Sequence, residues 1–473
     1  MGRTVISGGT VVTATETMTA DILIEGATVV ALAAPGSHGW TEGADRVVDA
    51  AGKIVTPGGI DVHTHMELPF GGTLSADTFE TGSRAAAWGG TTTIIDFAVQ
   101  SKGQSAMDGF EAWMAKAEGN CAIDYGFHMI TGDINEQTLK EMDMLMDEGV
   151  TSYKLFMAYP GVFYSTDGDI LRAMQKAADI GAVICMHAEN GIAIDVLVEQ
   201  ALARGETDPI YHGIVRRSVL EGEATNRAIA LAEVAGAPLY IVHLTAKEAL
   251  EAVTQARDLG KNVFAETCPQ YLFLDLDNMR NGFDGAKYVA SPPLRERSEG
   301  HQDRLWRGLA TNDLQIVSTD HCPFCMGDHH TFGKQKQLGV GDFTKIPNGM
   351  GTVEHRMELI HHGGVTEGRI SMNRFVEITA TAPAKMFGMF PKKGTIAVGS
   401  DADIVLWDQA GTRTLSVETH HMDVDYSAYE GIEVVGTVET VVSKGKVIIQ
   451  DGAYHGTAGD GEYLKRGSSQ LLI

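Results

Sequence analysis

The stretch GGIDVHTH, residues 58–65, joins a glycine pair to a short apolar run that ends in two histidines two positions apart. Such a run, bounded by glycine, is typical of a buried β-strand. Between this run and its successors, segments such as GDILRAMQKAADIG (168–181) have the spacing of amphipathic helices that end at glycine. Eight strands that alternate with helices predict an α/β fold, a (β/α)8 TIM-like barrel. The seven further runs are TTTIIDFA (91–98), YGFHMI (125–130), TSYKLFM (151–157), AVICMHAEN (182–190), LYIVHLT (239–245), NVFAETCP (262–269) and LQIVSTDH (314–321).

Both ends of the chain differ from this middle part. They contain short runs such as TVISGGTVVT (4–13) and VETVVSKGKVIIQDGAY (438–454), which alternate apolar and polar residues and are interrupted by glycine. A chain of 473 residues also exceeds what one hydrophobic core usually supports. We therefore expect three parts: a small β-sandwich domain from residues 1–56 and 392–455, a barrel catalytic domain over 57–391, and a C-terminal tail over 456–473.

Composition excludes several classes of partner. The net charge is −25 and lysines and arginines form no run, so binding to nucleic acid is not expected. The chain has neither an apolar run of about 18 residues nor a basic N-terminal stretch before an apolar core, which argues against membrane insertion and secretion. Five cysteines form no disulfide framework, and the CPFC pair (Cys322, Cys325) has no second pair for a zinc site. We expect a cytoplasmic protein.

Polar side chains lie near the ends of five of the predicted strands. Barrel enzymes assemble their sites at the C-terminal ends of the strands, where residues from separate strands converge. Side chains two positions apart on a strand share a face, so both histidines of the first strand can reach one ion. The six candidate residues are His63, His65, Lys154, His187, His243 and Asp320.

Four histidines and a carboxylate suit two divalent ions, because a catalytic zinc takes about three protein ligands and keeps an open position. Two ions about 3.5 to 4 Å apart need a bridging group. A buried lysine such as Lys154 has a lowered pKa, and its neutral amine can react with carbon dioxide to give an anionic carbamate. From the residues alone, an ordinary pair between Lys154 and a buried carboxylate remains the alternative.

Seven motifs together resemble one known family. They occur in the family's order and extend the resemblance over nearly the whole chain. The chain resembles the dihydropyrimidinase and D-hydantoinase branch of the amidohydrolase superfamily, the cyclic amidohydrolases. The motifs are DVHTHMELPFGGT (61–73), YKLFMAY (153–159), MHAEN (186–190), VHLT (242–245), SPPLR (291–295), STDHCPF (318–324) and GMGTVEHRM (349–357).

The resemblance implies two Zn²⁺ per subunit, bridged by an N6-carboxylysine at Lys154. His63, His65 and Asp320 would hold the more buried ion, and His187 and His243 the other. It further implies that a hydroxide between the ions attacks a cyclic amide carbon, with Asp320 as general base and then general acid. Tyr159 would support the oxyanion. Ser291 and Asn348 would bind the ring amide, largely through backbone groups.

The implied substrates are small cyclic amides, 5,6-dihydropyrimidines or 5-substituted hydantoins, which open to N-carbamoyl amino acids. We expect Met66, Phe156 and Phe163 to cover the substituent on the ring. Dihydroorotases carry an arginine where this chain has Glu67, which would repel a substrate carboxylate if it faced the pocket. An allantoinase-like enzyme for cyclic ureides remains an alternative.

A second alternative is a non-catalytic scaffold of the collapsin response mediator type, although those proteins lack the metal ligands that this chain retains. The resemblance also implies a homotetramer, in which the C-terminal tail could reach a neighbouring subunit. Arg217 stands where the family pattern has proline, so the family's loop shape cannot be assumed at this position. The adjacent histidine pairs at 329–330, 361–362 and 420–421 are expected to be surface or loop residues, because neighbouring positions chelate poorly.

Overall fold

The computed structural model describes residues 2–329 and 332–471. Its centre is an eight-stranded sheet in which all neighbouring strands are parallel, in the order β6-β9-β10-β11-β12-β13-β14-β15. The sheet curls until its ends meet, where the backbone N–H of His65 donates to the carbonyl of His321 at 2.9 Å. The predicted barrel is therefore confirmed. Its strands are β6 (Gly59–Thr64), β9 (Thr91–Gln100), β10 (Asp124–Thr131), β11 (Ser152–Phe156), β12 (Val183–His187), β13 (Leu239–Ile241), β14 (Val263–Thr267) and β15 (Ile316–Val317).

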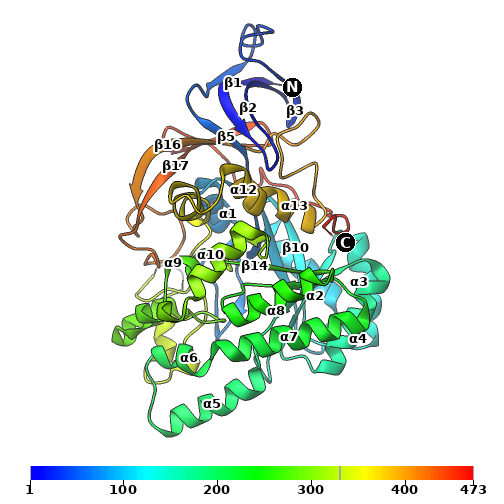
Figure 1. The fold of residues 1–473 in the computed structure, drawn as a ribbon, viewed down its shortest axis with the longest axis vertical. Coiled ribbons are helices and arrows are strands. Elements are labelled where there is room, and N and C mark those ends of the chain that lie inside the picture. Colours follow the sequence, from blue (N-terminus) through cyan, green and yellow to red (C-terminus); the bar gives the residue numbers. More distant parts are fainter. Residues whose placement is uncertain (1, 330–331, 472–473) are drawn as a thin grey trace.

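Helices surround the barrel strands (Figure 1). The helix predicted at 168–181 is α4, which begins with a capping box at Thr166 and ends at Gly181 in the left-handed conformation. The α-helices are α1 (Phe79–Trp88), α2 (Ala106–Ala117), α3 (Glu136–Asp147), α4 (Asp167–Ile180), α5 (Gly191–Ala203), α6 (Ile210–Val215), α7 (Ser218–Ala235), α8 (Lys247–Asp258), α9 (Pro269–Phe273), α10 (His301–Thr311), α11 (Arg356–Ile360), α12 (Met372–Val376) and α13 (Ala382–Met386). Shorter helical turns are η1 (Leu276–Arg280), η2 (Gly282–Tyr288), η3 (Arg297–Glu299), η4 (Lys336–Gly339), η5 (Phe343–Lys345), η6 (His361–Thr366) and η7 (Glu377–Thr381).

A second sheet lies at one end of the molecule and contains strands from both chain ends (Figure 1). Antiparallel pairing of β5 with β16 joins the two halves, and the sheet has an apolar core of its own. The expected β unit built from both chain ends is therefore present. Its strands are β1 (Arg3–Val12), β2 (Thr17–Glu25), β3 (Thr28–Ala33), β4 (Arg46–Asp49), β5 (Ile54–Pro57), β16 (Ile404–Thr414), β17 (Glu433–Ser443), β18 (Lys446–Gln450) and β19 (Ala453–Tyr454); a separate hairpin contains β7 (Pro69–Phe70) and β8 (Thr73–Leu74).

The glycine pair at 58–59 links the two sheets. A Cβ atom on Gly58 would lie 2.1 Å from the hydroxyl oxygen of Thr92, and one on Gly59 would lie 2.7 Å from the sulfur of Met357. Both positions therefore need glycine, because the chain enters the first barrel strand in close contact with its neighbours.

The C-terminal tail packs against its own chain. The backbone N–H of Leu464 donates to the carbonyl of Tyr125 at 2.7 Å, and that of Gln470 donates to Lys385 at 2.8 Å. These bonds hold the tail on its own chain up to residue 471, and residues 472–473 lie outside the described part; contact of the tail with a neighbouring subunit stays a prediction. No helix in the described chain has the length and apolar character needed to cross a bilayer.

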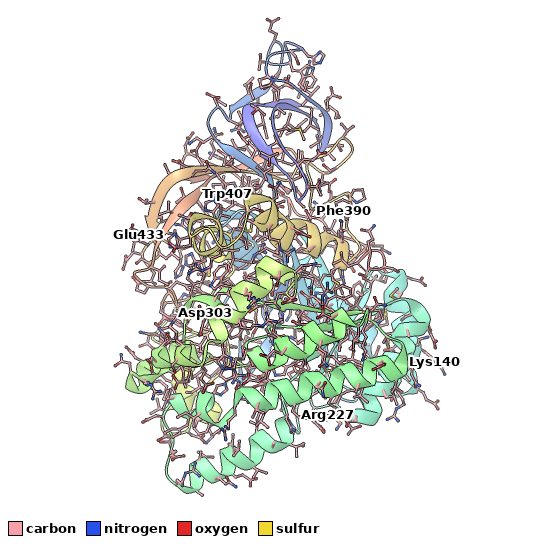
Figure 2. All side chains as sticks on the ribbon, in the orientation of Figure 1. Lys140, Arg227, Asp303, Phe390, Trp407 and Glu433 are labelled. Atoms are coloured by element: carbon pink, nitrogen blue, oxygen red, sulfur yellow. The ribbon has the colours of Figure 1, made fainter. Side chains whose placement is uncertain are left out.

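The histidine pairs are less exposed than expected. His361 is buried and stacks on Trp407 of β16, with ring centroids 5.0 Å apart; Figure 2 labels this tryptophan. The rings of His421 and Trp88 stack with centroids 3.9 Å apart, and Nδ1 of His421 contacts the buried carboxylate of Glu354. The expected surface location is therefore wrong for His361, which fills an apolar contact instead. His330 lies outside the described residues.

Candidate active site

The ends of the barrel strands bring three metal-ligating side chains together. Ligand atoms of His63, His65 and Asp320 all lie within 4.8 Å of one another. The Nε2 atoms of the two histidines are 3.1 and 3.2 Å from Oδ1 of Asp320. His63 is the fifth residue of β6, whereas His65 and Asp320 follow the last residues of β6 and β15. The predicted convergence of these residues is present.

Buried carboxylates orient the histidine rings. Glu266 on β14 contacts Nδ1 of His63, so the Nε2 atom faces Asp320. The same glutamate accepts a hydrogen bond from the backbone N–H of His243 at 3.1 Å. Glu189 contacts Nε2 of His187 at 2.8 Å, which leaves Nδ1 of that ring available. A carboxylate behind a histidine fixes its tautomer and raises its basicity, as behind metal-ligating histidines generally.

Two ring nitrogens in this cluster lack partners. Nδ1 of His65 and Nδ1 of His243 are buried and have no hydrogen-bond partner among the described residues. Burial lowers the pKa of His65 to about 3, so its ring is neutral near pH 7 and can offer a lone pair to a cation. Rings of His187 and His243 lie 4.6 Å apart between centroids. Burial also lowers the pKa of His187 and His243, so three neutral imidazoles lie near the Asp320 carboxylate, a donor set that suits divalent zinc.

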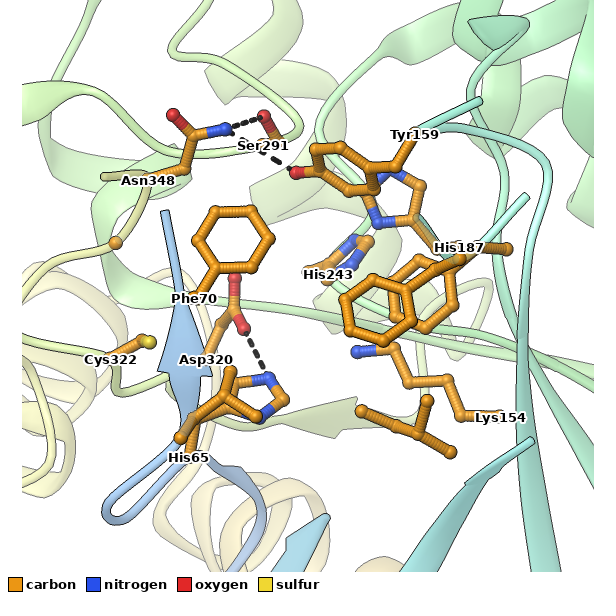
Figure 3. A pocket seen from close by; sticks show the side chains of 15 residues that line it. His65, Phe70, Lys154, Tyr159, His187, His243, Ser291, Asp320, Cys322 and Asn348 are labelled. Carbon is orange, nitrogen blue, oxygen red and sulfur yellow. Dashed lines mark hydrogen bonds and ion pairs between the residues drawn. The ribbon is translucent and has the colours of Figure 1, made fainter. Parts of the chain in front are cut away.

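Lys154 reaches the centre of the cluster from β11 (Figure 3). Its side chain is 2% exposed, and its Nζ lies 3.0 Å from Nε2 of His63 and 4.3 Å from the centre of the Phe97 ring. Burial lowers the pKa of this amine. Among the described residues, it forms no ion pair with a carboxylate within 4.0 Å. A direct lysine–carboxylate pair is therefore absent at this distance within the described chain, although the charges of Asp320 and Glu266 still favour the protonated amine.

Strained backbone conformations coincide with this cluster. Tyr159, His243 and Asp320 have φ angles of 60°, 41° and 54°, in the left-handed region that side chains other than glycine rarely adopt. Such conformations cost about 1 to 3 kcal/mol each and tend to persist where the surroundings hold a functional geometry. All three residues are among the candidate site residues predicted from the sequence.

A pocket of about 50 Å³ opens above the cluster (Figure 3). Its wall includes His65, Lys154, His187, His243 and Asp320. An outer pocket of about 910 Å³ shares part of this wall. On the opposite side, the Asn348 amide donates to the Ser291 hydroxyl at 3.1 Å and to the Tyr159 hydroxyl at 3.5 Å. The structure thus brings these three candidate substrate contacts to one side of the pocket.

Two of the three residues expected around the ring substituent line the pocket. Phe156 and Phe163 do so, and their rings stack at 5.0 Å. The prediction for Met66 is wrong, because its side chain is fully buried and packs toward Gly82 of α1. Glu67 also does not line either pocket, since its carboxylate accepts a hydrogen bond from the backbone of Phe79. The condition under which Glu67 would repel a substrate carboxylate, that it faces the pocket, is therefore not met.

Several residues of the pocket wall were not predicted from the sequence. Phe70 follows the H-x-H motif closely and meets Tyr159 edge to face at 5.6 Å. Cys322 also lines the pocket, whereas Cys325 is buried outside it. Both Phe70 and Cys322 stand inside motifs that carry the family resemblance, and this was the available signal. Arg217 has a φ of −60°, which proline also adopts, so the loop shape is compatible with the family pattern.

Comparison with known proteins agrees with this geometry. Residues 54–448 match the amidohydrolase family. The chain is 62% identical to a D-hydantoinase of Streptomyces coelicolor and 47% identical to one of Geobacillus stearothermophilus; the alignments cover 99% of this chain and 99% and 97% of those proteins. A crystal structure of a dihydropyrimidinase from Brevibacillus agri superposes with a TM-score of 0.95 at 49% identity, covering 99% of both chains.

The barrel, the cluster at its strand ends and these relatives together place the chain in a metal-dependent class of hydrolases. The chain belongs to the amidohydrolase family, in the branch of the dihydropyrimidinases and hydantoinases. The resemblance seen in the sequence is confirmed. The protein is an enzyme, a cyclic amidohydrolase, and the scaffold alternative is wrong.

Proposed function

We propose that this enzyme opens 5-substituted hydantoins and 5,6-dihydropyrimidines to N-carbamoyl amino acids. The observation that carries the proposal is the convergence of a histidine, lysine and aspartate cluster with a polar wall and an aromatic wall on one pocket. Relatives described as D-hydantoinase and dihydropyrimidinase support this choice of substrate.

We propose that two zinc ions occupy the cluster. His63, His65 and Asp320 would hold one ion, and His187 and His243 would hold the other. Carboxylated Lys154 would bridge them, which its burial and the position of its Nζ, 3.0 Å from Nε2 of His63, support. When bound, the ions would lower the pKa of water to about 7, and so supply a nucleophile at neutral pH.

The chain's own residues would then move the proton and hold the developing charge. Asp320 would accept a proton at its carboxylate as water attacks the amide carbon, and would return it to the ring nitrogen as the C–N bond breaks. Tyr159 would donate a hydrogen bond from its hydroxyl to the developing oxyanion, a contribution of about 2.7 to 4 kcal/mol for such donors. Burial raises the pKa of Tyr159, which keeps this donor protonated.

The two walls of the pocket would orient the ring. Ser291 and Asn348 would bind the ring amide, while Phe156, Phe163 and Phe70 would surround the substituent. An apolar surround favours uncharged or aromatic substituents, because a charged group would lose its hydration there.

A comparison of substrates tests the proposed function. We expect kcat/KM for dihydrouracil, hydantoin or 5-phenylhydantoin to exceed that for allantoin and dihydroorotate by about 10²-fold, because the polar substituents of the latter two would lose hydration against the aromatic wall of Phe70, Phe156 and Phe163. Ring opening can be followed by the loss of ultraviolet absorbance and by chromatography of the N-carbamoyl product. Turnover of allantoin alone would show that the substrate assignment is wrong.

We also propose that the enzyme is a cytoplasmic homotetramer. All five cysteines are free and buried, which supports a reducing compartment. Helix α5 is apolar on several sides and exposes Ile192, Val196 and Leu202, by 52%, 48% and 36%. An apolar helix that its own chain leaves exposed favours a subunit interface. A monomeric mass in light scattering would contradict the tetramer.

A further inference from the structure

Lys336, the first residue of η4, is a fully buried lysine that takes no part in the chemistry proposed above. Its Nζ donates hydrogen bonds to three backbone carbonyls, those of Pro347 at 2.7 Å, Gly349 at 2.9 Å and Val289 at 3.3 Å. An ammonium group has three N–H donors and no acceptor, so the three carbonyls satisfy it completely. The lysine therefore joins two loops that are far apart in the sequence.

This arrangement is costly for the fold. Among the described residues, no carboxylate forms an ion pair with Lys336, and burial lowers the pKa of its amine to about 7. Burial of an ammonium without a counter-ion is unfavourable unless hydrogen bonds compensate for it. An apolar side chain of similar length would fill the same space without this cost. The position of the three carbonyls therefore best explains why a lysine stands here instead of an apolar residue.

The three carbonyls belong to the wall that would bind the ring amide. Two of them, on Pro347 and Gly349, lie on either side of Asn348, and the third lies two residues before Ser291. The backbone N–H of Gly349 also donates to the carbonyl of Val289 at 2.9 Å, next to the lysine. The ammonium thus holds the peptide groups on both sides of Asn348 against the segment that leads to Ser291.

We propose that Lys336 is a positioning residue for substrate binding, which sets the distance between the Ser291 and Asn348 loops to fit a cyclic amide. The inference rests on the proposed function, because it concerns the wall that would bind the ring. A ring amide presents its N–H and C=O groups at a fixed spacing, so donor and acceptor groups on two loops must keep a matching spacing. Without the ammonium, the carbonyl oxygens of Pro347 and Gly349 would lose this donor, that of Val289 would keep only the Gly349 N–H, and the loops would separate.

The substitution Lys336→Met, in the zinc-loaded full-length enzyme, tests this role. We expect KM for the preferred cyclic amide to rise by about 10- to 100-fold with a smaller change in kcat, because a displacement of about 1 Å costs that much. Zinc content should remain as in the wild type. Lys393→Met is the matched control: Lys393 is equally buried but pairs with Asp124 and Asp403 away from the pocket. This control should lower the melting temperature and leave KM within about twofold of wild type.

A second variant keeps the test decisive if Lys336→Met does not fold. Lys336→Gln keeps two N–H donors, and we expect a rise in KM between those of the wild type and Lys336→Met. Unchanged KM in a folded Lys336→Met, or an equal rise in Lys393→Met, would overturn the proposal. Failure of both Lys336 variants to fold would also overturn it, because the lysine would then support the whole barrel. If the wild type opens none of the cyclic amides, the proposed function fails, whatever the variants show.

Discussion

The substitution Lys154→Gln should lower kcat/KM for ring opening by about 10³-fold or more, because metal activation contributes several kcal/mol and each 1.4 kcal/mol is a factor of ten. Glutamine has a similar length and is neutral, so it fills the space beside Phe97 and His63. It cannot form a carbamate, and the two ions would then lack their anionic bridge. The bound metal should fall below two ions per chain.

Metal analysis and steady-state kinetics on the same preparation measure both effects. Lys116→Gln is a suitable control, because Lys116 is half-buried on α2 and donates to the carbonyl of Glu67 outside the pocket. This control should keep its zinc and its activity. A folded Lys154→Gln variant with two ions per chain and activity within tenfold of wild type would show that no lysine bridge is needed.

Asp320→Asn should lower kcat by about 10² to 10⁴-fold, the usual contribution of a positioned general acid and base. Asparagine keeps an oxygen where Oδ1 meets His63 and His65, but it cannot accept a proton from water. KM should change little, because the wall that would bind the ring is untouched. Initial rates over a range of substrate concentration, with zinc content measured in parallel, separate kcat from KM.

A buried carboxylate remote from the pocket provides the control. Asp403 is 5% exposed and pairs with Lys393 in the small sheet region. Asp403→Asn should reduce stability while kcat stays near the wild-type value. Equal losses of kcat in both variants would mean that the effect of Asp320 is structural.

The residues of the metal cluster could be predicted because barrel geometry restricts where they can lie. A polar residue at the C-terminal end of one barrel strand lies at the same end of the barrel as the residues that end the other strands, whatever conformation the loops adopt. His187 at the last position of β12 and His63 near the end of β6 followed from this rule. The tail could not be predicted in this way, because backbone bonds such as that of Leu464 to Tyr125 hold it and leave no pattern in the sequence.

Met66 shows where the sequence argument for the pocket went wrong. Alternation along the strand places His63 and His65 on one face, and Thr64 and Met66 on the other. The structure follows this alternation: the Thr64 hydroxyl donates to Asp96 at 2.8 Å, and the Met66 side chain packs toward Gly82 of α1. A consistent use of the same rule would have excluded Met66 from the pocket.

The groups that orient the metal cluster and the polar wall of the pocket could be found only in the structure. Glu266 is 203 positions from His63, and Lys336 is 47 positions from Val289. A carboxylate at a strand end was visible in NVFAETCP, but the sequence did not show which histidine it would meet. Such contacts depend on side-chain direction and on loop conformation, which spacing along the chain does not specify.

The most direct test of the account is X-ray diffraction from zinc-loaded crystals, with anomalous data at the zinc edge. We predict two anomalous peaks about 3.5 to 4 Å apart between the histidines, with density for a carboxylate group beyond Nζ of Lys154. A bare Lys154 amine beside His63, with one peak or none, would contradict the account.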